Sequence, residues 1–294
     1  KMGLAYAKGD VVEVRPKQVE AKAPKAAGAE KSTDEFKARI ERDYPSETHP
    51  VVMEACGRVL DYHDAKYARL YLDRLDKLRE IDAARGNGDF KLTNEVARHL
   101  GLRMTFEDIM RVAQLKSRAS RVRREVQAEP DQLVQVTEFL KPGVEEFASV
   151  MPPFVARPML RWAEKKPERK RKTHVGMRIR SDTFFGFMRV RMVAGMKPMR
   201  RMGYRYKEEQ KQIERWLGLV LEAAAIDRDL ALEVTELARL IKGYGSTNAR
   251  GNANFDKIVA EVVRPALDAK NVSAASDIAK VREAALADPE GATL

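Results

Sequence analysis

The sequence predicts an all-α protein, an irregular domain of about eight helices with a loop-rich basic segment in its middle. Apolar residues recur at three- and four-residue steps along most of the chain, which is the period of an amphipathic helix. We find no internal repeat and no convincing alternation of strands with helices. With 294 residues, 44% of them apolar, the chain can bury a sizeable core in one large domain or two smaller ones.

Composition divides the chain into four parts. Residues 1–31 mix short Val-containing stretches with Ala, Pro, Lys and Gly and predict a linker. Residues 32–140 and 183–294 carry helical periods and predict an N-terminal and a C-terminal helical part. Between them, residues 141–182 are repeatedly interrupted by proline and predict a basic connection of loops and short turns.

In the N-terminal part, Ser32 and Glu35 form the capping pattern that begins a helix, here a short one. Pro50 then opens one long helix, which we expect to continue to the Gly-Asn-Gly stretch at Gly86. The residues that recur along its stripe are Val52, Cys56, Val59, His63, Tyr67, Leu70, Leu75 and Leu78.

Two further N-caps are expected in this part. Thr93 is the candidate cap of a short helix to Leu100, and Thr105 with Asp108 is that of another. Residues 133–139 suit a strand as well as a helix because they contain Val134, Val136 and Thr137, and both alternatives stay open.

The C-terminal part is expected to hold five further helices. Ser181 is the candidate cap of the first, which carries Phe184 and Phe185 and ends before Pro198. Gly243 should stop the third, because glycine just past a lysine-bearing last turn is a frequent helix end. The helices after the first should span Tyr204–Ala225, Asp227–Lys242, Asn254–Leu267 and Ser273–Leu286.

Positive charge is concentrated in one segment. The chain has 55 Lys and Arg against 44 Asp and Glu, and residues 161–211 alone hold 17 basic and 5 acidic residues. Three interpretations of this segment stay open: a solvated loop, a docking surface for an acidic protein or, third, a nucleic-acid interface. The third lacks a recognisable module for groove recognition or base stacking. The candidate anion- or partner-binding residues are Lys165, Lys166, Arg169, Lys170, Arg171, Lys172, Arg178 and Arg180.

A methionine stripe lies in the same segment. Met188, Met192, Met196 and Met199 are spaced by four, four and three residues and therefore share one helical face. We expect this face to lie in a core, which methionine fills adaptably. The alternative is a surface that faces a partner subunit, because basic residues lie between the methionines.

No catalytic site and no metal site is predicted. Cys56 is the only cysteine, so neither a disulfide nor an iron–sulfur cluster is expected, and its place on the stripe indicates a small core residue. The four histidines form no metal-binding motif, and nucleotide-binding and nucleophile-elbow motifs are missing from the sequence. Without a signal pattern or an apolar run of roughly 20 residues, we expect a cytoplasmic protein with no membrane contact.

One glycine-rich stretch concentrates polar groups between two expected helices. Its glycines allow positive φ, and its side chains offer donors to an anion near the next helix start. The alternative is a helix–helix corner whose side chains satisfy backbone groups. The glycine-loop candidates are Lys242, Gly243, Tyr244, Gly245, Asn248 and Arg250.

Three ordered motifs resemble one enzyme family. Residues 237–251, followed by Asn254 and Phe255, resemble the closing signature of the beta subunit of indolepyruvate ferredoxin oxidoreductases. Residues 61–75 are similar to a second signature of that region, and residues 184–210 to a third. The resemblance covers roughly residues 36–265.

The resemblance implies the C-terminal helical region of that subunit, with residues 1–31 as the segment that connects it to a preceding α/β domain. The enzyme class decarboxylates aryl 2-oxoacids oxidatively onto coenzyme A, using thiamine diphosphate and iron–sulfur clusters carried mainly by the larger subunit. No cofactor is expected on this chain, and its implied partners are that larger subunit and ferredoxin. Ser246 and Asn248 replace an expected Asp and His, which weakens any acid–base role of the glycine loop.

Two functional hypotheses follow. In the first, the chain is a non-catalytic region of such an oxidoreductase that contacts another subunit or a partner, and its basic segment faces an acidic protein or the diphosphate of coenzyme A. In the second, it is a stand-alone basic helical module that binds nucleic acid or an acidic protein. Salt-sensitive binding to DNA or RNA is the expectation of the second hypothesis.

Overall fold

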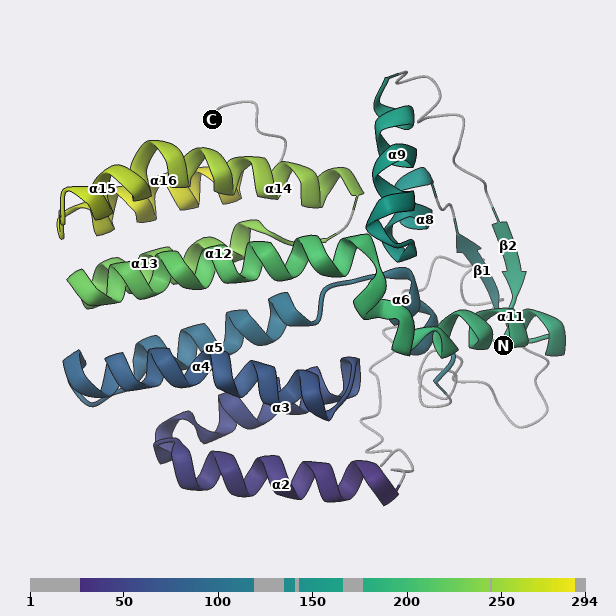
Figure 1. Cartoon of the computed structure of the whole chain (residues 1–294), viewed down its shortest axis with the longest axis horizontal. Helices are drawn as coiled ribbons and strands as arrows, with labels where there is room; N and C mark the ends of the chain where they lie inside the picture. Colours follow the sequence, from purple (N-terminus) through teal and green to yellow (C-terminus); the bar gives the residue numbers. More distant parts are fainter. Residues whose placement is uncertain (1–26, 119–134, 141–142, 166–176, 244, 289–294) are drawn as a thin grey trace, which may run out of the picture.

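The structure is a computed structural model of the chain, and it describes residues 27–118, 135–140, 143–165, 177–243 and 245–288. These residues form an all-α fold, as predicted, and in addition one small pair of strands. In Figure 1, helices α2 to α5 and α12 to α16 lie roughly side by side as a stack, and α8, α9, the strands and α11 stand at one end of it. No described helix is long and apolar enough to cross a membrane.

The N-terminal helices differ from the expected ones mainly in their boundaries. The long helix predicted from Pro50 is two helices, because the helical conformation is interrupted at His63 and Asp64. Asp64 is extended and caps the second helix by accepting a hydrogen bond from the Tyr67 amide at 2.8 Å. The first helix begins at residue 27, inside the expected linker. The elements are α2 (Ala27–Asp43), η1 (Ser46–Thr48), α3 (His49–Tyr62), α4 (Ala65–Arg85), α5 (Lys91–Met104) and α6 (Ile109–Lys116).

Two of the expected caps are wrong. Thr93 lies inside α5, where its hydroxyl donates to the buried Asp82 carboxylate at 2.8 Å. Thr105 follows α5, and its hydroxyl donates back to a carbonyl of that helix. The expected cap Asp108 is confirmed as the N-cap of α6, where its side chain accepts a hydrogen bond from the Arg111 amide.

The prediction that residues 141–182 form only loops and short turns is wrong. Pro153 occupies the first turn of a helix, where the missing N–H costs nothing, and Pro158 lies within the same helix. Strands β1 and β2 pair antiparallel, with Thr137 opposite Arg180, so the ambiguous segment is a strand at its end. The elements are β1 (Thr137–Leu140), α8 (Val144–Val150), α9 (Pro153–Glu164) and β2 (Met177–Arg180).

The C-terminal helices follow the predicted order. The expected cap Ser181 is wrong, because the hydroxyl of Thr183 accepts the hydrogen bond from the Gly186 amide at the start of α11. The elements are α11 (Phe184–Gly195), η2 (Lys197–Met202), α12 (Tyr204–Ile226), α13 (Arg228–Glu236), η3 (Leu237–Leu240), α14 (Gly245–Ile258), η4 (Val259–Val263), α15 (Arg264–Asp268) and α16 (Ala274–Ala287).

One core joins both helical parts. The cluster of buried apolar side chains runs from Phe36 on α2 to Ala285 on α16, and α12 packs against α4, α5 and α13. Trp216 of α12 is fully buried in it. Buried tyrosines keep their hydroxyls paired, since Tyr67 and Tyr71 donate to backbone carbonyls of α5 at 3.0 Å. The stack therefore forms a rigid support for the elements at its end.

Candidate protein-docking surface

Exposed apolar side chains gather at the end of the stack. Thirteen of the sixteen large apolar side chains that are exposed among the described residues lie between Phe139 and Met202. The other three, Leu102, Leu115 and Val272, lie outside that segment. Single exposed apolar residues are ordinary on proteins, but their concentration in one part of the chain makes this part a candidate interaction surface.

Helix α11 carries several of the most exposed of these side chains. Phe184, Phe185 and Met192 expose 73%, 75% and 69% of their surface, and Met188 is also exposed. The expectation that the methionine stripe lies in a core is therefore wrong, because no described element covers this face of α11. Two arginines on the same helix, Arg189 and Arg191, are exposed as well. We define the α11 surface as Phe184, Phe185, Met188, Arg189, Arg191 and Met192.

The opposite side of α11 holds the helix against the protein. Val190 is buried, and α11 packs on α6 and on the end of β2. At Gly186 a side-chain carbon would lie 1.8 Å from the Arg180 carbonyl oxygen, so only glycine allows this close approach. The exposed side chains are consequently displayed by a helix that is fixed at its start and along its inner side.

The segment after α11 is held by a buried cation. Arg200 on η2 donates from Nε to Asp108 Oδ2 at 2.6 Å and from Nη1 to the Tyr62 carbonyl at 2.5 Å. Its guanidinium lies 3.9 Å from the centre of the Tyr62 ring, and the Tyr62 hydroxyl donates to the same carboxylate at 3.0 Å. Every part of this network is buried. A buried charge of this kind is stable only when it is paired and hydrogen-bonded, as it is here.

Two further cations of η2 contact the junction between α3 and α4. Arg201 lies 2.7 Å from the Asp64 carboxylate, and Lys197 donates to the Asp61 carbonyl at 3.0 Å. Burial is the main cause that lowers the pKa of Lys197. For Asp61, burial alone would raise the pKa, but hydrogen bonds from Arg118 and Arg111 outweigh it and hold the pKa below its usual range. Arg200, Arg201 and Lys197 are thus paired with groups of the protein itself.

The basic candidate residues predicted from the sequence are only partly described. Lys165 is exposed at the end of α9. Arg178 lies over the Phe139 ring at 5.4 Å, and Arg180 pairs with Asp182 at 2.7 Å, so both have partners on or beside the strand pair. Lys166, Arg169, Lys170, Arg171 and Lys172 lie outside the described residues.

The expected glycine loop is mostly helix. Gly243 and Gly245 have φ of 71° and 58°, and α14 begins at Gly245 rather than near Asn254 as predicted. Asn248 is half-buried and accepts a hydrogen bond from the Asn252 side chain at 3.0 Å. The positive φ values allow the chain to turn into α14 directly, which the polar composition of this stretch did not indicate. Lys242 is exposed, Arg250 is half-buried, and Tyr244 lies outside the described residues.

One group of side chains with metal-ligating atoms was missed by the sequence analysis. Glu95 and His99 on α5 meet Glu236 at the end of α13, and one ligand atom from each lies within 4.8 Å of the others. A hydrogen bond to His99 is the main cause that lowers the pKa of Glu236 to about 2, and Arg239 adds to it. The spacing of four between Glu95 and His99 was the available signal, because such residues share a helix face.

The fold and the exposed face together describe an all-α protein with an exposed apolar face at one end of its helical stack. The chain belongs to a family of unknown function, DUF6537, whose family model matches residues 48–261. The matched range includes the α11 surface, the Arg200 network and the cluster formed by Glu95, His99 and Glu236. No curated protein and no solved structure matches the chain.

Proposed function

We propose that this chain is a non-catalytic, subunit-contacting region of an indolepyruvate-type oxidoreductase, which oxidatively decarboxylates aryl 2-oxoacids to acyl-CoA with ferredoxin as acceptor. The observation that carries the contacting role is the α11 surface, where exposed Phe and Met side chains stand beside Arg189 and Arg191. The enzyme class is supported by the three ordered motifs in the sequence. The proposal includes a cytoplasmic location.

Contacts between two of those motifs support their joint role. The motif at residues 61–75 contains Tyr62 and Asp64, and the motif at residues 184–210 contains Arg200 and Arg201. Arg200 bonds to the Tyr62 carbonyl and Arg201 pairs with Asp64, so the two motifs meet at the base of α11. In this proposal, residues that resemble the family hold the base of the docking surface in place.

The chemistry of the surface favours a protein as its occupant. Aromatic, Met and Arg side chains are enriched at the centres of protein interfaces, and lasting interfaces are more apolar than transient ones. Nucleic acid would be met mainly by Lys and Arg with stacking platforms. We therefore assign the α11 surface to an acidic face of the larger, thiamine-diphosphate-bearing subunit, and ferredoxin becomes an outcome of the test.

Cofactor chemistry would belong to that larger subunit. The single cysteine of this chain, Cys56, is buried in the core, so its residues do not fit an iron–sulfur cluster. Thiamine diphosphate and coenzyme A would likewise meet residues outside this chain. What this chain supplies is a rigid face that fixes the position of its neighbour.

The test is co-purification of the chain with the larger subunit from the same genome. Phe185→Asp and Met192→Asp should each weaken association about tenfold or more, because a charge is placed at an apolar interface centre. Val272→Asp, at another exposed apolar residue outside this region, should leave association unchanged. Unchanged association in both α11 variants, or no complex with the native chain, overturns the proposal. An intact complex with slowed ferredoxin reduction would assign the surface to ferredoxin instead.

A further inference from the structure

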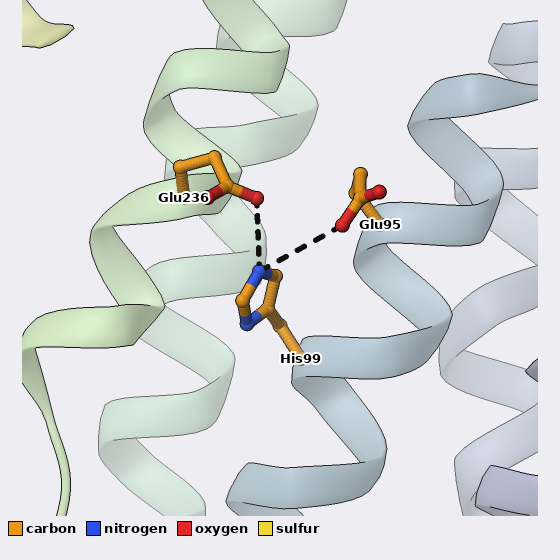
Figure 2. Close-up of side chains that lie close together, drawn as sticks. All are labelled: Glu95, His99 and Glu236. Carbon is orange, nitrogen blue, oxygen red and sulfur yellow. Dashed lines mark hydrogen bonds and ion pairs between the residues drawn. The ribbon is translucent and has the colours of Figure 1, made fainter.

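Glu95, His99 and Glu236 converge on one small volume between two helices (Figure 2). Glu95 and His99 are one turn apart on α5, and Glu236 comes from the end of α13. The His99 Nε2 atom lies 3.0 Å from Glu236 Oε1 and 4.0 Å from Glu95 Oε2. The three side chains are mostly shielded from solvent, with exposed fractions of 20% for Glu95, 9% for His99 and 22% for Glu236.

We propose that these three residues bind a divalent transition-metal ion of the zinc class. Zinc takes imidazole nitrogen and carboxylate oxygen at about 2.0–2.1 Å, which places neighbouring ligand atoms of a tetrahedron about 3.3 Å apart. The distances of 3.0 and 4.0 Å from His99 Nε2 bracket that value, so small rotations of the glutamates complete the geometry. A nitrogen and two carboxylates also suit the borderline character of zinc better than that of calcium or magnesium.

An adjacent hollow supplies an independent reason to expect a ligand. It has a volume of about 570 Å³ and lies between α5, α13 and α16. Both glutamates line it together with the acidic residues Asp229 and Glu233, and the basic residues of its wall are Lys91, Arg98 and Arg282. Three protein ligands leave the fourth position of a tetrahedral ion open, which is the arrangement in zinc sites that exchange water or bind small molecules. Here that position would lie beside a hollow of mixed charge, which has room for water or a small polar ligand.

The competing interpretation is an ion-pair network that only joins α5 to α13. Arg98 lies 3.3 Å from Glu95, and Arg239 lies 3.3 Å from Glu236, so each carboxylate already has a cation. In that network the contact between His99 and Glu236 joins the helices, whereas Glu95 is too far from His99 for a hydrogen bond. Glu95 therefore distinguishes the two interpretations. A bound metal ion would need Glu95 as a ligand, whereas the contact that joins the two helices in the ion-pair network does not involve it.

The experiment is a calorimetric titration of the full chain, freed of metal by a chelator, with Zn²⁺ alone. We expect one saturable site in the native chain and at least about tenfold weaker binding in Glu95→Gln and His99→Asn, because each variant loses a ligand. His49→Asn is the control for adventitious histidine binding, since His49 is the partly buried histidine that contacts the Tyr44 carbonyl. It should bind Zn²⁺ like the native chain.

Substitution with Co²⁺ gives a second readout that does not depend on affinity. A tetrahedral cobalt site absorbs strongly in the visible range, and this absorption should be present in the native chain and lost in His99→Asn. Circular dichroism of each variant separates loss of the site from loss of the fold. No saturable site in the native chain, or an affinity in Glu95→Gln and His99→Asn equal to that of the native chain, overturns the proposal. The α11 surface is untouched in these variants, so subunit association tests the proposed function separately.

Discussion

Arg200 and Asp108 form an ion pair that is almost completely enclosed by the protein. The Nε and Oδ2 atoms are 2.6 Å apart, and the two side chains expose 1% and 4% of their surface. Asp108 is also the N-cap of α6, and Arg200 follows α11 directly on η2. This one contact therefore ties the base of the α11 surface to the N-terminal helices.

We expect Arg200→Met to lower the free energy of unfolding by about 3–5 kcal/mol. The variant leaves the Asp108 carboxylate buried without its cation, and that uncompensated charge is the main cost. Urea denaturation followed by circular dichroism measures the change. Arg189→Met removes an exposed arginine of α11 and should change stability by less than about 0.5 kcal/mol. Equal effects of the two variants would contradict the assigned role of Arg200.

The carboxylate of Asp61 should make a pH-dependent contribution to stability. Its folded pKa is held below the usual value by Arg118 and Arg111 against the opposing effect of burial. A lowered pKa stabilises the folded state above the unfolded pKa of about 4, and this stabilisation is lost as pH falls through the folded pKa. The stability difference between the native chain and Asp61→Asn should accordingly shrink from pH 7 to pH 3.

Asp268→Asn provides the comparison for this pH dependence, because Asp268 is an exposed carboxylate at the end of α15. The comparison separates the effect of the two arginines from that of merely removing a surface carboxylate. A difference for Asp61→Asn that stays constant, or that grows as the solution is acidified, would show that the arginines do not stabilise the charged form.

Cys56 should resist alkylation in the folded protein. Burial raises the pKa of its thiol to about 12, so hardly any thiolate is present at pH 8 and the sulfur is also shielded. We expect iodoacetamide to modify the chain rapidly in concentrated urea and negligibly in native buffer. Intact-mass measurement follows the modification. Rapid modification under native conditions would mean that the α3 region opens easily or that the thiol is not buried.

Gly251→Ala should destabilise the chain by about 1–3 kcal/mol. A side-chain carbon at this residue of α14 would lie 2.2 Å from the Leu240 carbonyl oxygen, and a backbone atom cannot move aside cheaply. Gly57→Ala offers a contrast within α3, because no atom lies within 4 Å of its added carbon. There alanine should be neutral or stabilising by up to about 1 kcal/mol. Thermal unfolding of both variants decides whether α14 packs this closely on η3.

Local sequence was sufficient for the fold class and for several helix boundaries. The helix expected over Tyr204–Ala225 is α12 (Tyr204–Ile226), because a long apolar period and the Asp227 cap of the next helix define it locally. The helix expected to start at Ser273 is α16, which begins one residue later. Periodicity and capping depend on neighbouring residues, so they can be read without knowing the rest of the fold.

Local signals failed where distant residues stabilise an unusual chain path. The period of the expected long helix continues through His63, yet the chain breaks there, and Arg200 binds the Tyr62 carbonyl that the break leaves free. Arg201 holds Asp64 on the other side of the break. Both arginines are more than 130 residues away along the chain, so no short window of sequence contains the reason for the break.

The candidate sites depend on the same distinction. Periodicity shows that Met188 and Met192 share a helix face with Phe184, but whether that face is covered depends on which elements reach it, and this is a property of packing. His99 and Glu236 are 137 residues apart and meet only because α5 and α13 pack together. Side-chain types and their local spacing are encoded in short stretches, whereas burial and convergence arise from contacts between helices that are far apart in the chain.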